Sequence, residues 1–295
     1  MDIILKTILA LMTGFFGSYY IADVVKNKNM LSSKSWYPVL GTGFVTNFFD
    51  TLGIGSFAFQ TAIFKLFKLV DDRLIPGTMN VGNTIPTVVQ AFIFMTVVKV
   101  DSLTLVSMSA SAPMGALLGA GIVAKMSRRK IQLGLGFGLM AVAFIMIAGL
   151  FKLMPAGGVA IGLTGWKLAL IVVLSFIFGA LQSIGVGFYA PCMAMVYILG
   201  LHPQTAFPIM MTVTAMLMAA GGAKFVKENA YDRKTAISLT IAGIAGVFLA
   251  AFVIKSLPLI VLKWVVCIVV MYSSISMFIS AKRKDSQPSF HKINK

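Results

Sequence analysis

The composition of the chain excludes most soluble folds. It has 295 residues, of which 58% are hydrophobic and only 12% are charged. A soluble globule of this size needs more polar surface, so we expect an integral membrane protein. The formal net charge of +16 comes largely from Lys and Arg in short loops between apolar segments. This distribution is typical of membrane topology signals and argues against nucleic acid as a partner.

Apolar segments of about 20 residues, the length of a membrane-crossing helix, occur along the chain. The first, Ile3 to Val25, has charged residues only near its ends, and no small-residue cleavage site precedes Lys26. We therefore expect a membrane span there, not a signal peptide. Other predicted spans have no Asp, Glu, Lys or Arg: Leu74 to Val98, Ser102 to Ala124, Ile131 to Phe151, Thr235 to Ile254 and Trp264 to Ala281.

Two further apolar segments, Pro38 to Lys68 and Lys167 to Gly200, are too long for one crossing and too short for two. Each is interrupted by a Gly-x-Gly pair, which suggests a broken helix; the glycines are Gly53, Gly55, Gly185 and Gly187. A shift of about 132 residues aligns the two pairs, and it also aligns Pro76 with Pro208. The chain therefore contains a predicted internal repeat.

The predicted fold is an all-α polytopic membrane protein with two inverted repeats. Each repeat is a re-entrant or broken helix followed by about three transmembrane helices, and one extra helix precedes them. The expected segments are an N-terminal helix and cytoplasmic loop at 1–36, repeat 1 at 37–151, an extracytoplasmic linker at 152–166, repeat 2 at 167–281 and a basic cytoplasmic tail at 282–295.

Clusters of Lys and Arg set the predicted orientation, because such clusters remain in the cytoplasm. They are Lys26, Lys28 and Lys34; Lys125, Arg128, Arg129 and Lys130; Lys224, Lys227, Arg233 and Lys234; and Lys282, Arg283 and Lys284. The second cluster reaches the cytoplasm only if Pro38 to Lys68 is a re-entrant hairpin. The second hairpin then opens outside, between Pro155 to Gly165 and Leu201 to Pro203. Each repeat is expected to cross the membrane an odd number of times, so the second repeat is inverted relative to the first.

The broken segments resemble a known family. Leu52-Gly53-Ile54-Gly55 and the stretch from Ile184 to Pro191 are similar to the Gly-rich motif of the TauE/SafE anion exporters, roughly G-x-G-G-G followed by an apolar-Pro pair. The likeness covers nearly all of residues 37–281, although other residues replace the last two glycines of each motif. It implies a secondary transporter of sulfite, sulfonates or related organosulfur or carboxylate anions. It also implies export by alternating access across the cytoplasmic (inner) membrane, and no enzymatic activity.

The candidate substrate site lies at the two breaks, because a helix that starts there presents free N–H groups and a positive dipole end to an anion. The candidate residues are Thr51, Gly53, Gly55, Ser56, Asn80, Asn83, Thr84, Gln182, Ser183, Gly185, Gly187, Thr212 and Thr214. The alternative for each glycine is close helix packing, and for each polar side chain it is a hydrogen bond between helices.

Asp50 is the acidic residue placed deepest in a hydrophobic segment, where ionisable groups are costly. It either takes up a proton during transport or caps the broken helix, and both interpretations stay open. Small anions and the lipid bilayer are the expected partners, with protons and a second copy of the chain as further candidates. We expect no cofactor and no bound metal, because Cys192 and Cys267 lie far apart. The alternatives are a cation or metal permease and a non-transporting membrane enzyme or scaffold subunit.

Overall fold

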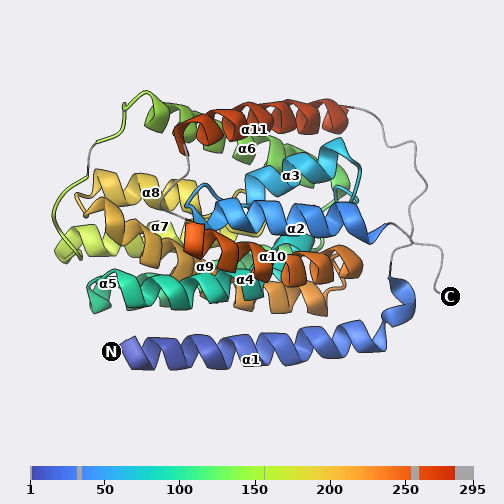
Figure 1. Ribbon diagram of the computed structural model, residues 1–295, viewed down its shortest axis with the longest axis horizontal. Coiled ribbons are helices and arrows are strands. Elements are labelled where there is room, and N and C mark those ends of the chain that lie inside the picture. Colours follow the sequence, from blue (N-terminus) through green and yellow to red (C-terminus); the bar gives the residue numbers. More distant parts are fainter. Residues whose placement is uncertain (1, 32–34, 156, 254–258, 283–295) are drawn as a thin grey trace.

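The computed structural model describes residues 2–31, 35–155, 157–253 and 259–282 (Figure 1). These residues form α-helices, two 3-10 turns and no β-strand. The helices are α1 Asp2–Lys26, α2 Trp36–Thr51, α3 Phe57–Leu66, α4 Ile75–Val97, α5 Ser102–Val123, α6 Arg128–Leu150, α7 Gly165–Gln182, α8 Tyr189–Ile198, α9 Ala206–Lys227, α10 Arg233–Val253 and α11 Leu259–Lys282. Lys34 and the tail after Lys282 lie outside the described residues.

Within the described part of the chain, 6 helical segments are long and apolar enough to cross a membrane. They correspond to α1, α5, α6, α7, α9 and α10, which confirms the prediction of an all-helical membrane protein. The predicted span at Leu74 to Val98 forms α4, a helix of 23 residues. It is not among the six segments, because Thr, Asn and Gln side chains line one of its faces. Those side chains are buried against the protein, away from lipid.

Both Gly-x-Gly pairs interrupt a helix, as predicted. Leu52–Ser56 separates α2 from α3, and Ser183–Phe188 separates α7 from α8. The φ angles are +82° and +89° at Gly53 and Gly55, and +101° and +81° at Gly185 and Gly187. This left-handed region of φ favours glycine, because glycine lacks a Cβ atom. The short helices α3 and α8 have 10 residues each, less than the length of a membrane crossing.

The loops gather at two ends of the helix bundle. At the basic end, Arg128 lies 3.8 Å from Asp71, and Arg233 forms an ion pair with Asp23. At the linker end, the N–H of Gly158 donates to Leu201, and the N–H of Asp101 donates to Ile161. Hairpin α2–α3 begins and ends at the basic end, whereas α7–α8 begins and ends at the linker end (Figure 1).

The helices of residues 36–150 and those of residues 165–282 have corresponding neighbours. Helix α2 packs on α10 as α7 packs on α5, and α3 packs on α11 as α8 packs on α6. Helix α4 contacts both α9 and α10, and α9 contacts both α4 and α5. The closest helix crossings correspond as well. Gly115 lies against the carbonyl of Phe176, and Gly246 lies against the carbonyl of Phe44.

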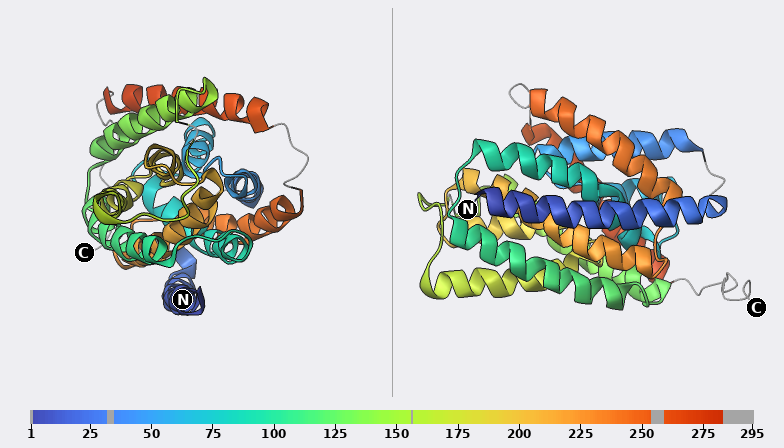
Figure 2. Two further views of the ribbon diagram at one scale, coloured as in Figure 1. Left: turned by 90° about the vertical axis from the view of Figure 1, so that its left-hand side faces the viewer. Right: turned by 90° about the horizontal axis from the view of Figure 1, so that it is seen from below.

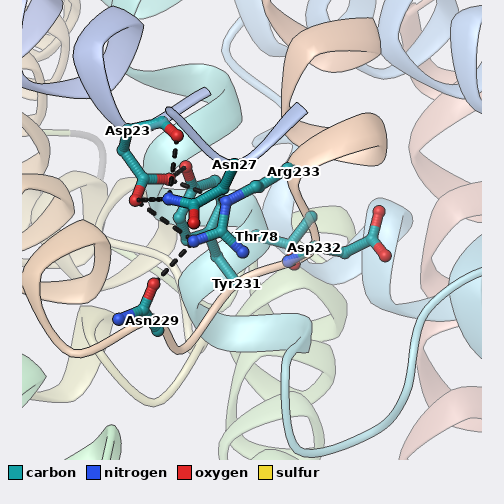
Figure 3. Close-up of polar contacts among 7 residues, drawn as sticks. All are labelled: Asp23, Asn27, Thr78, Asn229, Tyr231, Asp232 and Arg233. Carbon is teal, nitrogen blue, oxygen red and sulfur yellow. Dashed lines mark hydrogen bonds and ion pairs between the residues drawn. The ribbon is translucent and has the colours of Figure 1, made fainter. Parts of the chain in front are cut away.

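Helix α1 lies along one side of the bundle, opposite α6 and α11 (Figures 1 and 2). Its last turns are tied to the start of α10. Arg233 donates to both carboxylate oxygens of Asp23, at 2.8 and 3.1 Å, and also to Asn229 (Figure 3). The hydroxyl of Tyr231 donates to Asp23 as well. Burial raises the pKa of Tyr231, and the Asp23 carboxylate raises it further, so this hydroxyl stays a donor.

Candidate functional site

A small cavity lies between the two breaks, in the middle of the bundle. The starts of α3 and α8 face each other across it. A Cβ atom at Gly55 would lie 3.8 Å from the Cβ of Tyr189, and one at Gly187 would lie 3.4 Å from the Cβ of Phe57. The cavity measures about 30 Å³. That is room for about one or two water molecules.

The lining of this central cavity combines backbone of both breaks with a few polar side chains. It consists of Asp50, Ile54, Gly55, Ser56, Phe57, Ala58, Thr87, Val142, Gln182, Val186, Gly187, Phe188, Tyr189, Ala190, Thr214 and Met218. Among these residues there is one carboxyl group and no Lys, Arg or His. The groups available to an anion are therefore backbone N–H groups, hydroxyls and an amide.

In the first half of the chain, the break is held by Asp50. Its side chain is 3% exposed, and its Oδ1 accepts a hydrogen bond of 2.5 Å from the backbone N–H of Ser56. The carboxyl group thus caps the start of α3, where the first N–H groups have no partner within the helix. Gln90 and Tyr189 lie beside it: the Tyr189 hydroxyl donates to the Gln90 side chain at 2.9 Å, and Gln90 donates to Thr51 at 3.0 Å.

A buried amide network stands behind the first break and joins α2, α3 and α4. Gln60 and Asn83 donate to each other at 2.8 and 2.7 Å. Asn47 donates to Asn83 at 2.9 Å, and Gln60 donates to Thr46 at 2.7 Å. Because unpartnered amides are costly in a low-dielectric interior, these bonds fix the relative positions of the three helices.

In the second half, the corresponding polar groups lack such partners. Gln182 is 1% exposed, and neither its Oε1 nor its Nε2 has a hydrogen-bond partner among the described residues. The hydroxyl of Thr214, on α9, is also buried without a partner. Both residues line the central cavity beside Gly187. A bound ligand with acceptor atoms would accept hydrogen bonds from the Gln182 Nε2 and from the Thr214 hydroxyl.

The structure brings together some of the sequence-predicted site residues. Six of them line the central cavity: Asp50, Gly55, Ser56, Gln182, Gly187 and Thr214. The others do not line it: Thr51, Gly53, Asn80, Asn83, Thr84, Ser183, Gly185 and Thr212. Among these, Ser183 donates to the carbonyl of Ala116, and Thr84 donates to the carbonyl of Asn80. Hydrogen bonds within and between helices account for such positions.

Tyr189, Thr87 and Gln90 are site residues that the sequence analysis does not predict. Tyr189 lies within the Gly-rich motif, and its hydroxyl reaches across the cavity from the second half to Gln90 in the first. Thr87 and Gln90 lie one and two turns beyond Asn83 on the same face of α4. The helical period of the predicted span, extended past Thr84, would have identified both.

A larger pocket of about 300 Å³, the vestibule, lies next to the central cavity. Ile54, Tyr189 and Ala190 line both spaces, so a single layer of residues separates them. The vestibule extends between α6 and α8 to Lys152 at the linker end. Its other lining residues are Gly53, Ile145, Met146, Gly149, Leu150, Met154, Met193, Ala194 and Tyr197. The vestibule thus lies between the central cavity and the linker end.

At the basic end, charged and polar contacts of Asp72 join the end of α3 to the start of α6. Asp72 is buried, lies 2.5 Å from the ammonium group of Lys65 on α3, and accepts from Gln132 on α6 at 2.7 Å.

In the described part of the chain, no three His, Cys, Asp or Glu residues are grouped so that they could hold a metal ion.

The chain was also compared with known proteins. Residues 168–295 match the family described as Sulfite exporter TauE/SafE. This range begins in α7 and includes the second break, Gln182 and Thr214. Searches of curated proteins and of solved structures gave no match.

Proposed function

We propose that this chain, whose residues 168–295 match the TauE/SafE family, is a secondary transporter of small anions. Sulfite, sulfonates and related organosulfur or carboxylate anions are the candidate substrates. The observation that carries the proposal is the central cavity, into which one helix start from each half of the chain points. Helix N-termini bind anions through free N–H groups and the positive end of the helix dipole.

Inverted repeats at 37–151 and 167–281 are part of this proposal. Helix boundaries recur after about 131 residues, and corresponding helices have corresponding neighbours. Helix α2 runs from the basic end toward the middle, whereas α7 runs there from the linker end (Figure 1). The opposite directions support the inversion. The positive-inside rule then assigns the basic end and the C-terminus to the cytoplasm, and the linker to the outside of the cytoplasmic membrane.

Alternating access follows from this arrangement, because a site between two inverted halves can face either side when one half rocks against the other. The vestibule at the linker end and the ionic contacts of Asp72 at the basic end suit a state closed toward the cytoplasm. Opening toward the cytoplasm requires these contacts to separate. Export is the direction that the family implies.

Proton coupling through Asp50 is a further part of the proposal. The residue lines the cavity, so its carboxylate and a bound anion would repel each other. Uptake of a proton by Asp50 and binding of the anion would therefore favour each other. Tyr189 is the other titratable side chain in the cavity lining. A capping role at α3 is the competing interpretation, since Asp50 accepts from Ser56.

A cation permease is the second candidate function, and the buried Asp50 carboxylate favours it. In that case the carboxylate itself would hold the ion, and Asp50→Asn would abolish binding. An anion transporter would retain binding in this variant. A membrane enzyme or scaffold subunit would show neither activity.

The test is flux into proteoliposomes that contain the purified protein. Labelled sulfite, methanesulfonate, acetate and sodium ions are offered separately, with and without an imposed pH gradient. We expect saturable movement of one or more anions and none of sodium. Saturable sodium flux without anion flux would contradict the proposal and support the cation permease.

A further inference from the structure

The two breaks share a backbone arrangement but differ in one residue. The shift of about 132 residues that aligns the Gly-x-Gly pairs also places Asp50 on Gln182. Each residue lies at the end of the first helix of its hairpin and lines the central cavity. Repeat 1 thus has an acid where repeat 2 has a neutral amide of similar hydrogen-bonding reach.

This difference leaves only one helix start available to an anion. The start of α3 already has an anionic group beside it, because the Asp50 carboxylate accepts a hydrogen bond from the N–H of Ser56. At the start of α8, the N-cap residue Phe188 makes no side-chain cap hydrogen bond. Gln182 instead lines the cavity with both side-chain polar atoms unpartnered, and the Thr214 hydroxyl is unpartnered as well. Buried polar groups without partners are rare and costly, and they point to an absent ligand.

We propose that the transported anion binds in the second half-site, formed by the Gln182 amide, the Thr214 hydroxyl and the first N–H groups of α8. The Asp50 carboxylate fills the first half-site as a built-in anion. The inference rests on the proposed function, and it specifies where a single anion sits in a nearly symmetric cavity.

The same geometry selects the charge of the substrate. No Lys, Arg or His is among the residues that line the cavity, and a carboxyl group already lies there. Neutral donors can stabilise one negative charge, but a second would be poorly compensated and would be repelled by Asp50. The substrates are therefore monoanions with a small oxyanion group, such as hydrogen sulfite or a short sulfonate. An organic group would extend past Ala190 into the vestibule.

Binding of labelled methanesulfonate and of labelled sulfate to the detergent-purified chain tests both statements. Gln182→Glu places a carboxylate in the second half-site, as Asp50 does in the first, and should abolish methanesulfonate binding. Gln182→Leu removes the amide without adding charge. It should weaken binding about 10- to 100-fold, the value of hydrogen bonds to a charged group. Sulfate should bind at least about tenfold more weakly than methanesulfonate to the unaltered chain.

Two further variants complete the experiment, the first as a control and the second as a test of the Asp50 charge. Ser175→Ala removes another buried, unpartnered hydroxyl of α7 that does not line the cavity, and binding should not change. Asp50→Asn keeps the acceptor for Ser56 but removes the negative charge that would repel the anion, so methanesulfonate should bind more tightly than it does to the unaltered chain. Size-exclusion profiles show which variants are folded. If Gln182→Glu does not fold, the test rests on Gln182→Leu.

The outcomes distinguish a failure of this inference from a failure of the proposed transport function. If the unaltered chain binds no anion, the proposed function fails and the inference with it. If the unaltered chain binds methanesulfonate but folded Gln182→Leu binds it equally well, only the second half-site is overturned. Loss of binding in Asp50→Asn with retention in Gln182→Leu would place the anion in the first half-site instead. Equal binding of sulfate and methanesulfonate would overturn the charge selection.

Discussion

Helices α2, α3 and α4 and their counterparts α7, α8 and α9 have the same arrangement but different interiors. In the first set, the Gln60 and Asn83 amides bond to each other and to neighbours on the adjoining helices. In the second set, Gln182, Thr212 and Thr214 have side-chain atoms that are buried without partners. The comparison teaches that the backbone break is common to both halves, whereas the polar side chains are bonded to one another more fully in the first half than in the second.

The first half is also the more polar one. Asn47, Gln60 and Asn83 correspond to Gly179, Cys192 and Ala215 at an offset of about 132 residues. A network that is largely satisfied in a low-dielectric interior fixes geometry. Small and apolar residues at the corresponding positions leave α7, α8 and α9 without such cross-links. We therefore expect α8 to be the hairpin helix that moves when the site opens.

The largest effect is expected from filling the break itself. Gly187→Leu puts a side chain at a φ of +81° and against Phe57 across the cavity, so transport should be abolished. Gly200→Leu is the matched control, because Gly200 has a φ of +85° and a Cβ added there would meet no atom within 4 Å. Both variants should lose about 1–2 kcal/mol of stability through backbone strain. Flux into proteoliposomes and thermal unfolding in detergent measure the two effects.

Normal transport by a well-folded Gly187→Leu protein would remove the break from the site. Equal loss of transport in both variants would mean that strain alone, and not occupation of the cavity, disables the protein. Gly55→Leu extends the comparison to the first half, where the added side chain would approach Tyr189. We expect it to block transport as well, because both breaks line the same cavity.

A smaller and more specific effect is expected from Asp50→Asn. The amide keeps an acceptor oxygen for Ser56 but cannot exchange a proton. Anion exchange should continue, whereas acceleration by an imposed pH gradient should disappear. Flux measured at equal pH and with a gradient separates the two. If Asp50 is only a cap, thermal stability falls and the response to the gradient is unchanged, and that result would end the proton-coupling interpretation.

The smallest effect distinguishes hydrogen-bonded from unpartnered side chains by stability alone. Asn83→Ala removes the donor to the Gln60 Oε1 and one of the two acceptors of both the Gln60 and the Asn47 amide groups, so it should lower the free energy of unfolding by about 1–3 kcal/mol. Thr212→Val removes a buried hydroxyl that has no partner, so stability should stay the same or rise. Thermal unfolding in one detergent provides both values. A larger loss in Thr212→Val than in Asn83→Ala would reverse the comparison.

Much of the architecture was predictable from the sequence, because membrane helices are marked by length and polarity. The predicted span at Ser102 to Ala124 corresponds to α5, and both broken segments have their breaks at the predicted glycines. The helical start of α6 at Arg128 lies before the predicted Ile131, since a window free of charge cannot contain the basic first turn. A charged residue at the membrane interface can belong to a helix even though it ends the charge-free segment by which the span is recognised in the sequence.

The site was predictable only in part. Gly55, Gly187 and Gln182 follow from the breaks, because residues next to a break share its location. Which face of α4 or α9 points to the cavity depends on helix rotation, and the sequence pattern did not settle it. The sequence pattern therefore groups Asn80 and Thr212 with Thr214, although only Thr214 lines the cavity. The partner of Asp23, namely Arg233 at the start of α10, also required the tertiary structure (Figure 3).

The central claim is that the two hairpins enter the membrane from opposite sides, so that one cavity can serve both. Single cysteines at Lys68 and His202, in a chain whose Cys192 and Cys267 are replaced by Ala, test it most directly. An impermeant thiol reagent added to intact cells should label His202→Cys, and it should label Lys68→Cys only after the membrane is opened. Labelling of both residues from the same side would contradict the inverted arrangement.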